Sequence, residues 1–232
     1  MSRFESEHSW ILHRRPWRES SLLVELFSFE HGRVGLVARG LRSQSSPWRG
    51  LGEPFIPLRA AWVRRGELGT LSDVEAVGAR VALSGQALWC GLYANELILT
   101  LLGRDDSVPS LFSAYGGLLP RLADEAGRHS ALRLFELAVL DALGVAPDLT
   151  REAMQGEPVQ PEGWYSLDPE AGFVAAAPGR GVYSGRAILS LSGAPGSDAE
   201  VRRQAREIMR VLIDHQLDGR PLKTRELFRS VR

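Results

Sequence analysis

The chain has 232 residues, 44% of them hydrophobic and 24% charged, and its 28 basic side chains balance 28 acidic ones. This composition excludes an intrinsically disordered chain and indicates one large domain or two modest ones. No apolar run reaches the roughly 18 residues of a membrane span, and the first residues lack the apolar centre of a signal peptide. A single cysteine, Cys90, excludes an intramolecular disulfide and a multi-cysteine zinc site. We therefore expect a cytoplasmic protein.

Short apolar runs separated by turn residues predict five strands, at 8–15, 20–29, 34–38, 56–64 and 69–76. Pro16 lies between the first two runs and is expected to interrupt a strand ladder there. The turn signal at His31-Gly32 joins the second and third runs into a predicted hairpin. A loop rich in Gly, Ser, Pro and Arg covers residues 39–54. Five short strands with turns between them predict a small barrel over residues 1–80.

Helical periodicity begins after residue 80 and predicts helices at 84–103, 108–125, 130–143, 198–217 and 221–228. The clearest is 130–143, where Leu132, Phe135 and Val139 form an apolar face at spacings of three and four. Residues 147–185 instead show short β-like pieces among Pro and Gly, which predicts a small irregular insert in a helical domain at 81–232. The sequence thus predicts an α+β protein: a five-stranded barrel followed by a mainly helical domain.

The zero net charge conceals a separation of charge along the chain. Residues 1–80 carry twelve arginines against nine acidic residues, and residues 201–232 carry nine basic against four acidic ones. Within the first block, seven arginines are opposed only by Glu53: Arg33, Arg39, Arg42, Arg49, Arg59, Arg64 and Arg65. Such a cluster is typical of a protein that binds a phosphate backbone. A solvated strand-and-loop surface is the alternative that charge alone leaves open.

A second basic set lies near the C-terminus and consists of Arg202, Arg203, Arg206, Arg210, Lys223 and Arg225. Three of these arginines recur at every fourth residue of the predicted helix 198–217. They form a stripe separate from its apolar face, which carries Val201, Ala205, Ile208 and Leu212. The stripe either extends a nucleic-acid path or is a solvated helix surface.

Motifs for enzymatic chemistry are missing from the sequence. Lys223 lacks the preceding glycine of a P-loop, and no G-x-S-x-G nucleophile elbow is present. The five histidines include no close metal-binding pair, and Cys90 in its apolar helix is expected to be buried and structural. We therefore expect a binding protein without a cofactor, and a hydrolase or nuclease is the least favoured class.

Aromatic residues are interleaved with the arginines of the first third. Phe27, Phe55 and Trp62 are expected to belong to the barrel core. Trp48 lies between Arg42 and Arg49 in the polar loop, so it is the best candidate for stacking on an unpaired base.

Four segments carry more specific motifs: LHRRPWRESSLLVELFSFEHGRVGLVARGLRS at 12–43, LSGQALWCGLYANELI at 83–98, ALRLFELAVLDALG at 131–144 and GRPLKTRELF at 219–228. Together they resemble the bacterial RecO family of recombination mediators and DNA repair proteins over essentially the whole chain. The resemblance implies an N-terminal OB barrel, then a helical domain with a small insert. It also implies binding of single- and double-stranded DNA, annealing of complementary strands, and help in loading RecA onto SSB-coated strands with RecR and RecF.

The resemblance places DNA contacts by position on the basic barrel surface, at Arg33, Arg39, Arg42, Arg49, Arg64 and Arg65. We expect the path to be extended by the C-terminal set, unless its stripe is only a solvated helix surface. The residues concerned are Arg202, Arg203, Arg206, Arg210, Lys223, Arg225 and Arg229. A protein-interaction scaffold that does not bind DNA is the competing class. As a DNA-bound protein, the chain would be associated with the nucleoid.

Two further expectations concern the helical domain. The family binds the acidic, Phe-ended tail of SSB there, and Arg133, the only cation of residues 131–144, is our candidate. A surface arginine on a structural helix is the alternative for this residue. Many RecO proteins hold zinc with four cysteines in the insert, whereas residues 147–185 contain none. We expect no zinc, and an insert core built from Trp164, Tyr165 and Phe173.

Overall fold

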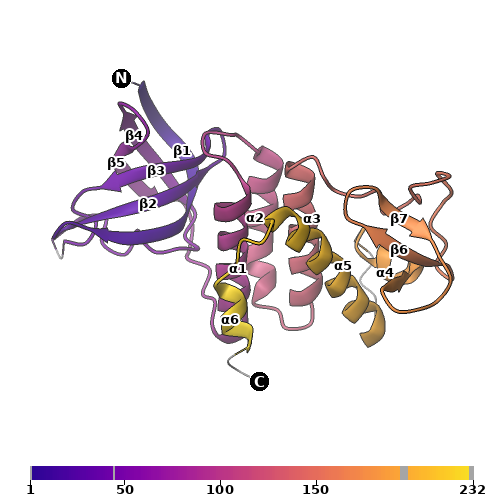
Figure 1. Ribbon diagram of the computed structural model, residues 1–232. Helices are drawn as coiled ribbons and strands as arrows, with labels where there is room; N and C mark the ends of the chain where they lie inside the picture. The colour runs from indigo at the N-terminus through magenta and orange to yellow at the C-terminus, as the bar shows by residue number, and fades with distance from the viewer. Residues whose placement is uncertain (1, 44, 194–197, 230–232) are drawn as a thin grey trace. The chain divides into compact units, whose positions relative to one another are not determined.

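The computed structural model describes residues 2–43, 45–193 and 198–229 (Figure 1). The chain packs into two compact units. The barrel unit comprises residues 1–123 and 222–232, and the α3–α5 unit comprises residues 124–221. The division that the sequence suggests at residue 80 remains a prediction, because these units are defined by packing and not by independent folding.

Five strands form the closed barrel that the sequence predicts, in the order β1-β2-β3-β5-β4. Their bounds are β1 Ser2–Trp17, β2 Ser21–Ser28, β3 Gly32–Ala38, β4 Leu58–Arg64 and β5 Gly69–Ala76. All neighbouring strands are antiparallel except β3 and β5, which are parallel. The expected hairpin of β2 and β3 is confirmed. Phe27, Phe55 and Trp62 are each at most 2% exposed. Trp62 belongs to the barrel core as expected, whereas Phe27 packs against Phe112 and Tyr115 of the helical region.

Pro16 does not interrupt the first strand, contrary to the sequence-based expectation. The strand β1 runs through it, and Pro16 lies opposite Leu22 of β2. The other neighbour of β1 is β4, which pairs only with residues 2–9. Around residue 16 the strand therefore has a hydrogen-bonded neighbour on one side only, and edge positions of this kind tolerate proline.

Three helices complete the barrel unit: α1 Gly85–Leu101, α2 Pro109–Leu122 and α6 Thr224–Arg229. All three were expected from the sequence, with slightly different ends. Ser84 is the N-cap residue of α1, but its side chain makes no capping hydrogen bond. Cys90 is buried in α1, as its apolar surroundings predicted.

The α3–α5 unit contains α3 Arg128–Ala142, β6 Trp164–Asp168, β7 Gly172–Ala175, β8 Val182–Ser184, α4 Gly185–Ser190 and α5 Ala199–Leu217. The β-like pieces of the insert form a small antiparallel sheet in the order β7-β6-β8. Tyr165 and Phe173 are buried in it as expected, but Trp164 is 37% exposed, so its predicted place in the core is wrong. Successive residues of a strand face opposite sides, and Tyr165 takes the inner one.

Candidate nucleic-acid interface

One end of the barrel carries arginines from two segments that are distant in sequence. The turn Arg18–Ser20 joins β1 to β2, and the loop after β3 folds onto it. The backbone N–H of Arg42 donates to the carbonyl oxygen of Ser20 at 3.1 Å. The Arg42 guanidinium donates to the carbonyl oxygen of Arg18 at 3.4 Å. These contacts hold the polar loop 39–57 against the β1–β2 turn.

The exposed arginines of this region, called here the loop-end arginines, are Arg15, Arg18, Arg39, Arg42 and Arg49. Glu53, the acidic residue of the loop, forms an ion pair with Arg14 at 2.6 Å. Three of the five were candidates from the sequence. Arg15 and Arg18 were missed because Pro16 was interpreted as a break, whereas the continuous hairpin carries them to the same place.

Trp48, the sequence candidate for base stacking, is half-buried and packs against the hydrophobic core of the barrel together with Leu51. Its ring is therefore only partly available for contact with a base.

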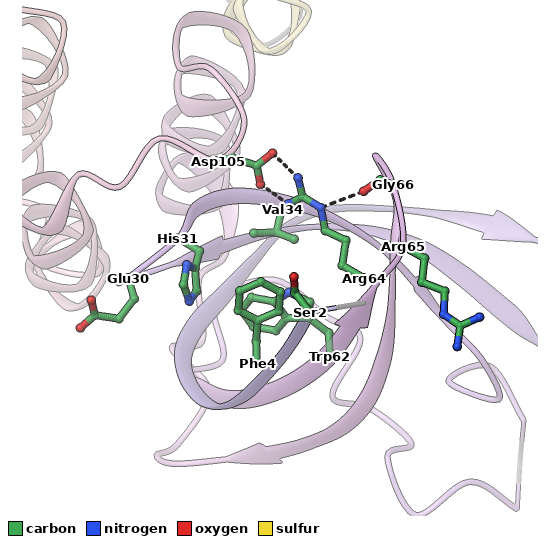
Figure 2. A pocket seen from close by; sticks show the side chains of 10 residues that line it. All are labelled: Ser2, Phe4, Glu30, His31, Val34, Trp62, Arg64, Arg65, Gly66 and Asp105. Carbon is green, nitrogen blue, oxygen red and sulfur yellow. Dashed lines mark hydrogen bonds and ion pairs between the residues drawn. The ribbon is translucent and has the colours of Figure 1, made fainter.

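Arg33 and Arg64 are held within the protein. The Arg33 guanidinium donates to the carbonyl oxygen of Leu102 at 2.5 Å and pairs with Glu25 at 3.5 Å, and burial lowers its pKa. Arg64 makes a two-pronged pair with Asp105, with one N–O distance of 2.7 Å (Figure 2). This hydrogen-bonded pair lowers the pKa of the Asp105 carboxyl. Both guanidinium groups are committed to carboxylates, so we leave them out of the backbone-binding surface.

A second group of basic side chains lies on α3 and α5 of the α3–α5 unit. Burial lowers the pKa of His129, and the positive charges of Arg133, Arg128, Arg206 and Arg202 lower it further. These four residues are called here the α3–α5 basic cluster. Arg133 is half-buried and pairs at 2.9 Å with the carboxylate of Glu136, which is 2% exposed. Arg202 and Arg206 are exposed on α5.

The remaining C-terminal candidates are divided between the two units, and those on α5 lie close to acidic residues. Arg210 is exposed and lies 3.5 Å from Asp214. Arg203 is bound on both sides, by Glu200 at 2.5 Å and Glu207 at 2.6 Å. Lys223 and Arg225 belong to the barrel unit, whereas the α5 arginines belong to the other.

Comparison with known proteins identifies the family. A family model described as Recombination protein O N terminal matches residues 1–80, and one described as Recombination protein O C terminal matches residues 83–226. The chain belongs to the RecO family of DNA repair proteins. The interpretation drawn from the four motif segments is thereby confirmed.

Curated relatives named DNA repair protein RecO match nearly the whole of this chain. The DNA repair protein RecO of Methylococcus capsulatus is 43% identical over 229 residues, which is 99% of this chain and 95% of the relative. That of Alkalilimnicola ehrlichii is 48% identical over 228 residues, 96% and 90% of the two chains. That of Shigella flexneri is 40% identical over 226 residues, 97% and 93%. Within the described residues, no helix is long and apolar enough to cross a bilayer.

Two polar residues of the RecO-like segment GLY-x-NEL tie the barrel unit together. The Asn95 side chain is 2% exposed; it donates to the carbonyl oxygen of Leu12 at 2.8 Å and accepts from the Tyr115 hydroxyl at 2.6 Å. Glu96 accepts the backbone N–H groups of Lys223 at 2.8 Å and Thr224 at 2.9 Å. The motif therefore joins α1 to β1, α2 and α6. The two adjacent polar residues Asn95 and Glu96 inside an apolar helix are the sequence signal from which this role could have been predicted.

The insert does not fit a four-cysteine zinc site, because residues 147–185 contain no cysteine. Within the described ranges, no three His, Cys, Asp or Glu side chains converge as metal ligands. Carboxylates hold the loop instead. Glu152 accepts the backbone N–H of Met154 at 2.9 Å, and Asp148 accepts that of Thr150 at 2.7 Å. Hydrogen bonds from Thr150 lower the pKa of Asp148, and backbone hydrogen bonds, first that from Met154, lower the pKa of Glu152.

Proposed function

We propose that this RecO-family protein is a recombination mediator that binds single- and double-stranded DNA through the loop-end arginines. It anneals complementary strands and, with RecR and RecF, helps RecA load onto SSB-coated DNA. The observation that carries the proposal is the contact between two segments that carry exposed arginines. The loop with Arg39, Arg42 and Arg49 is hydrogen-bonded to the β1–β2 turn, which carries Arg18 and follows Arg15. Guanidinium groups suit phosphate oxygens because their planar fork presents several donors at once.

Annealing requires no catalytic residue in this proposal, so the protein acts as a binding protein and not as an enzyme. Neutralising phosphates on two strands lowers their mutual repulsion and raises their local concentration. Base pairing then supplies the free energy. The protein needs neither a nucleotide nor a metal for this step, and its expected location is the cytoplasm, at the nucleoid.

The double variant Arg39→Ala/Arg42→Ala tests the interface. Each phosphate contact on a single strand contributes about 0.7 to the slope of log affinity against log salt, so losing two should reduce the slope by about 1.4. Fluorescence anisotropy of a labelled oligonucleotide, titrated at several salt concentrations, measures this slope.

A matched control removes the same charge from the insert with Arg180→Ala/Arg186→Ala. Arg180 and Arg186 are both exposed, and Arg186 pairs with Glu162. The control should leave the slope unchanged. An unchanged slope in the Arg39/Arg42 variant would remove the loop from the interface. If the unaltered protein showed no salt-dependent binding, the alternative of a scaffold that does not bind DNA would replace the proposal.

For the SSB tail we propose the α3–α5 basic cluster, with Arg133 at its centre. An acidic peptide ending in Phe needs cations beside an apolar surface. Arg133 is followed by the half-buried Leu134, and Arg128, Arg202 and Arg206 add positive charge nearby. Because Arg133 is already paired with Glu136, the outer arginines must supply most of the attraction for an acidic peptide.

Arg206→Glu and Arg133→Glu should each weaken binding of an SSB tail peptide at least about tenfold, because hydrogen bonds to charged groups contribute about 1.5–3 kcal/mol. Isothermal titration calorimetry with the free peptide measures the affinity. Arg151→Glu, at an exposed position in the insert, is the control and should leave binding intact. Undiminished affinity in both cluster variants would show that the tail binds elsewhere.

A further inference from the structure

A cavity of about 430 Å³ opens beside the barrel, between the start of β1 and the β4–β5 turn (Figure 2). The residues that matter for its chemistry are Phe4, His31, Trp62, Arg64, Arg65 and Asp105. Its volume lies at the lower end of the range for small-molecule pockets, about 300–1,000 Å³. The space suits one nucleotide unit and not a length of strand.

Three aromatic rings form one wall of this cavity. Phe4 stacks on Trp62 with 5.1 Å between ring centroids and 21° between planes. His31 meets Phe4 edge-on at 4.7 Å and Trp62 at 5.7 Å. Trp62 is fully buried, whereas Phe4 is half-buried. Phe4 is thus an aromatic platform fixed from beneath by a buried indole.

Two adjacent arginines lie at the rim, where β4 ends. The Arg64 guanidinium is fixed by Asp105 and by the carbonyl oxygen of Gly66, to which it donates at 2.9 Å. Arg65 is exposed and extends away from Arg64 (Figure 2). A fixed guanidinium group therefore lies at the rim of the cavity, and a second one points outward from it (Figure 2).

We propose that this cavity is a subsite for a single unpaired nucleotide, whose base stacks on Phe4 and whose phosphate is met by Arg65. A planar aromatic ligand is favoured because every base offers a π-face. An anionic group is favoured by the exposed Arg65, since the charge of Arg64 is already balanced by Asp105. The subsite rests on the proposed function, since the nucleotide belongs to a bound single strand. It lies apart from the loop-end arginines, which hold the strand by its backbone.

The indole of Trp62 supports Phe4 and has no exposed surface of its own. Its Nε1–H group has no hydrogen-bond partner among the residues that the structure describes.

The test uses an oligothymidine strand with one central 2-aminopurine, whose fluorescence falls when it stacks on an aromatic ring. The unaltered protein should quench it. Phe4→Leu, which keeps an apolar side chain and removes the ring, should abolish the quench and weaken strand affinity about five- to a hundredfold. Phe4→Tyr, which keeps the ring, should retain both. Arg65→Ala provides a second variant at an exposed position and should also reduce the quench.

Trp164→Leu removes a partly exposed aromatic residue from the α3–α5 unit and is the matched control, with no expected change. Anisotropy of the same strand reports total binding separately. If the strand binds but Phe4→Leu and Arg65→Ala quench as fully as the unaltered protein, the subsite is wrong and the proposed function stands. If the strand fails to bind the unaltered protein, the proposed function itself is wrong, and the subsite falls with it.

Discussion

Asn95→Leu is expected to lower the free energy of unfolding of the barrel unit by about 2–5 kcal/mol. The substitution removes the donor to the Leu12 carbonyl and the acceptor of the Tyr115 hydroxyl, and each buried group deprived of a partner costs about 1–3 kcal/mol. Leu12 falls at the β-bulge between the paired residues Ile11 and His13, so its carbonyl depends on the side chain from α1. Burial raises the pKa of Tyr115, so its hydroxyl stays protonated and donates.

Urea titration followed by tryptophan fluorescence measures this effect, because all the tryptophans except Trp164 lie in the barrel unit. Tyr115→Phe, which removes only the hydroxyl, should cost less. In the double variant the two effects should not add, because both changes break the same hydrogen bond. Strictly additive losses would show that Asn95 does not act through Tyr115.

Gly32→Ala is expected to destabilise the barrel unit by more than about 3 kcal/mol. Gly32 has φ +61, a conformation that costs a residue with a side chain about 1–3 kcal/mol, and an added Cβ would lie 1.8 Å from the carbonyl oxygen of Asp106. The backbone at residue 32 must therefore move away from the backbone at Asp106. Separation would break the hydrogen bond from the Asp105 N–H to the Arg33 carbonyl at 3.0 Å and loosen Asp105 from Arg64.

Gly40→Ala is the matched control for this prediction. Gly40 has φ +73 but no atom within 4 Å of an added Cβ, so the substitution carries the conformational cost without the collision. Thermal unfolding of the two variants should differ clearly, and hydrogen exchange at 103–108 should accelerate only in Gly32→Ala. Equal losses of stability would mean that the close approach of Asp106 contributes nothing.

The barrel could be predicted from the sequence because its information is local. Strand alternation, the His31-Gly32 turn and the polar loop each depend on neighbours a few residues away. The same locality explains the errors. Pro16 is a breaker by composition, yet it lies opposite Leu22 of β2 in a part of β1 that has no second neighbour. Trp164 is a large apolar residue and was therefore predicted to be buried, but Tyr165 occupies the inner face of the same strand.

The candidate interface was harder to predict because it depends on which charges meet. Arg33 and Arg39 are equivalent in the sequence, as cations flanking one strand. In the structure Arg33 binds Glu25 and the carbonyl of Leu102, the latter 69 residues away, whereas Arg39 is exposed. Arg64 meets Asp105 at a separation of 41 residues. Such pairings are set by the folded barrel, so charge counts alone could not separate the exposed arginines from the internal ones.

The hydrogen bonds between Glu96 of α1 and the start of α6 affect the order in which the protein can fold during synthesis. Residues 222–229 pack with the barrel unit although residues 124–193 and 198–221 form a unit of their own, so the sequence of one unit interrupts that of the other. On the ribosome, α1 emerges long before the backbone N–H groups from which its Glu96 accepts hydrogen bonds. Those groups belong to Lys223 and Thr224, which lie 127 and 128 positions later in the chain. The barrel unit can therefore reach its final form only after Lys223 and Thr224 have emerged, and the inserted unit leaves the exit tunnel before them.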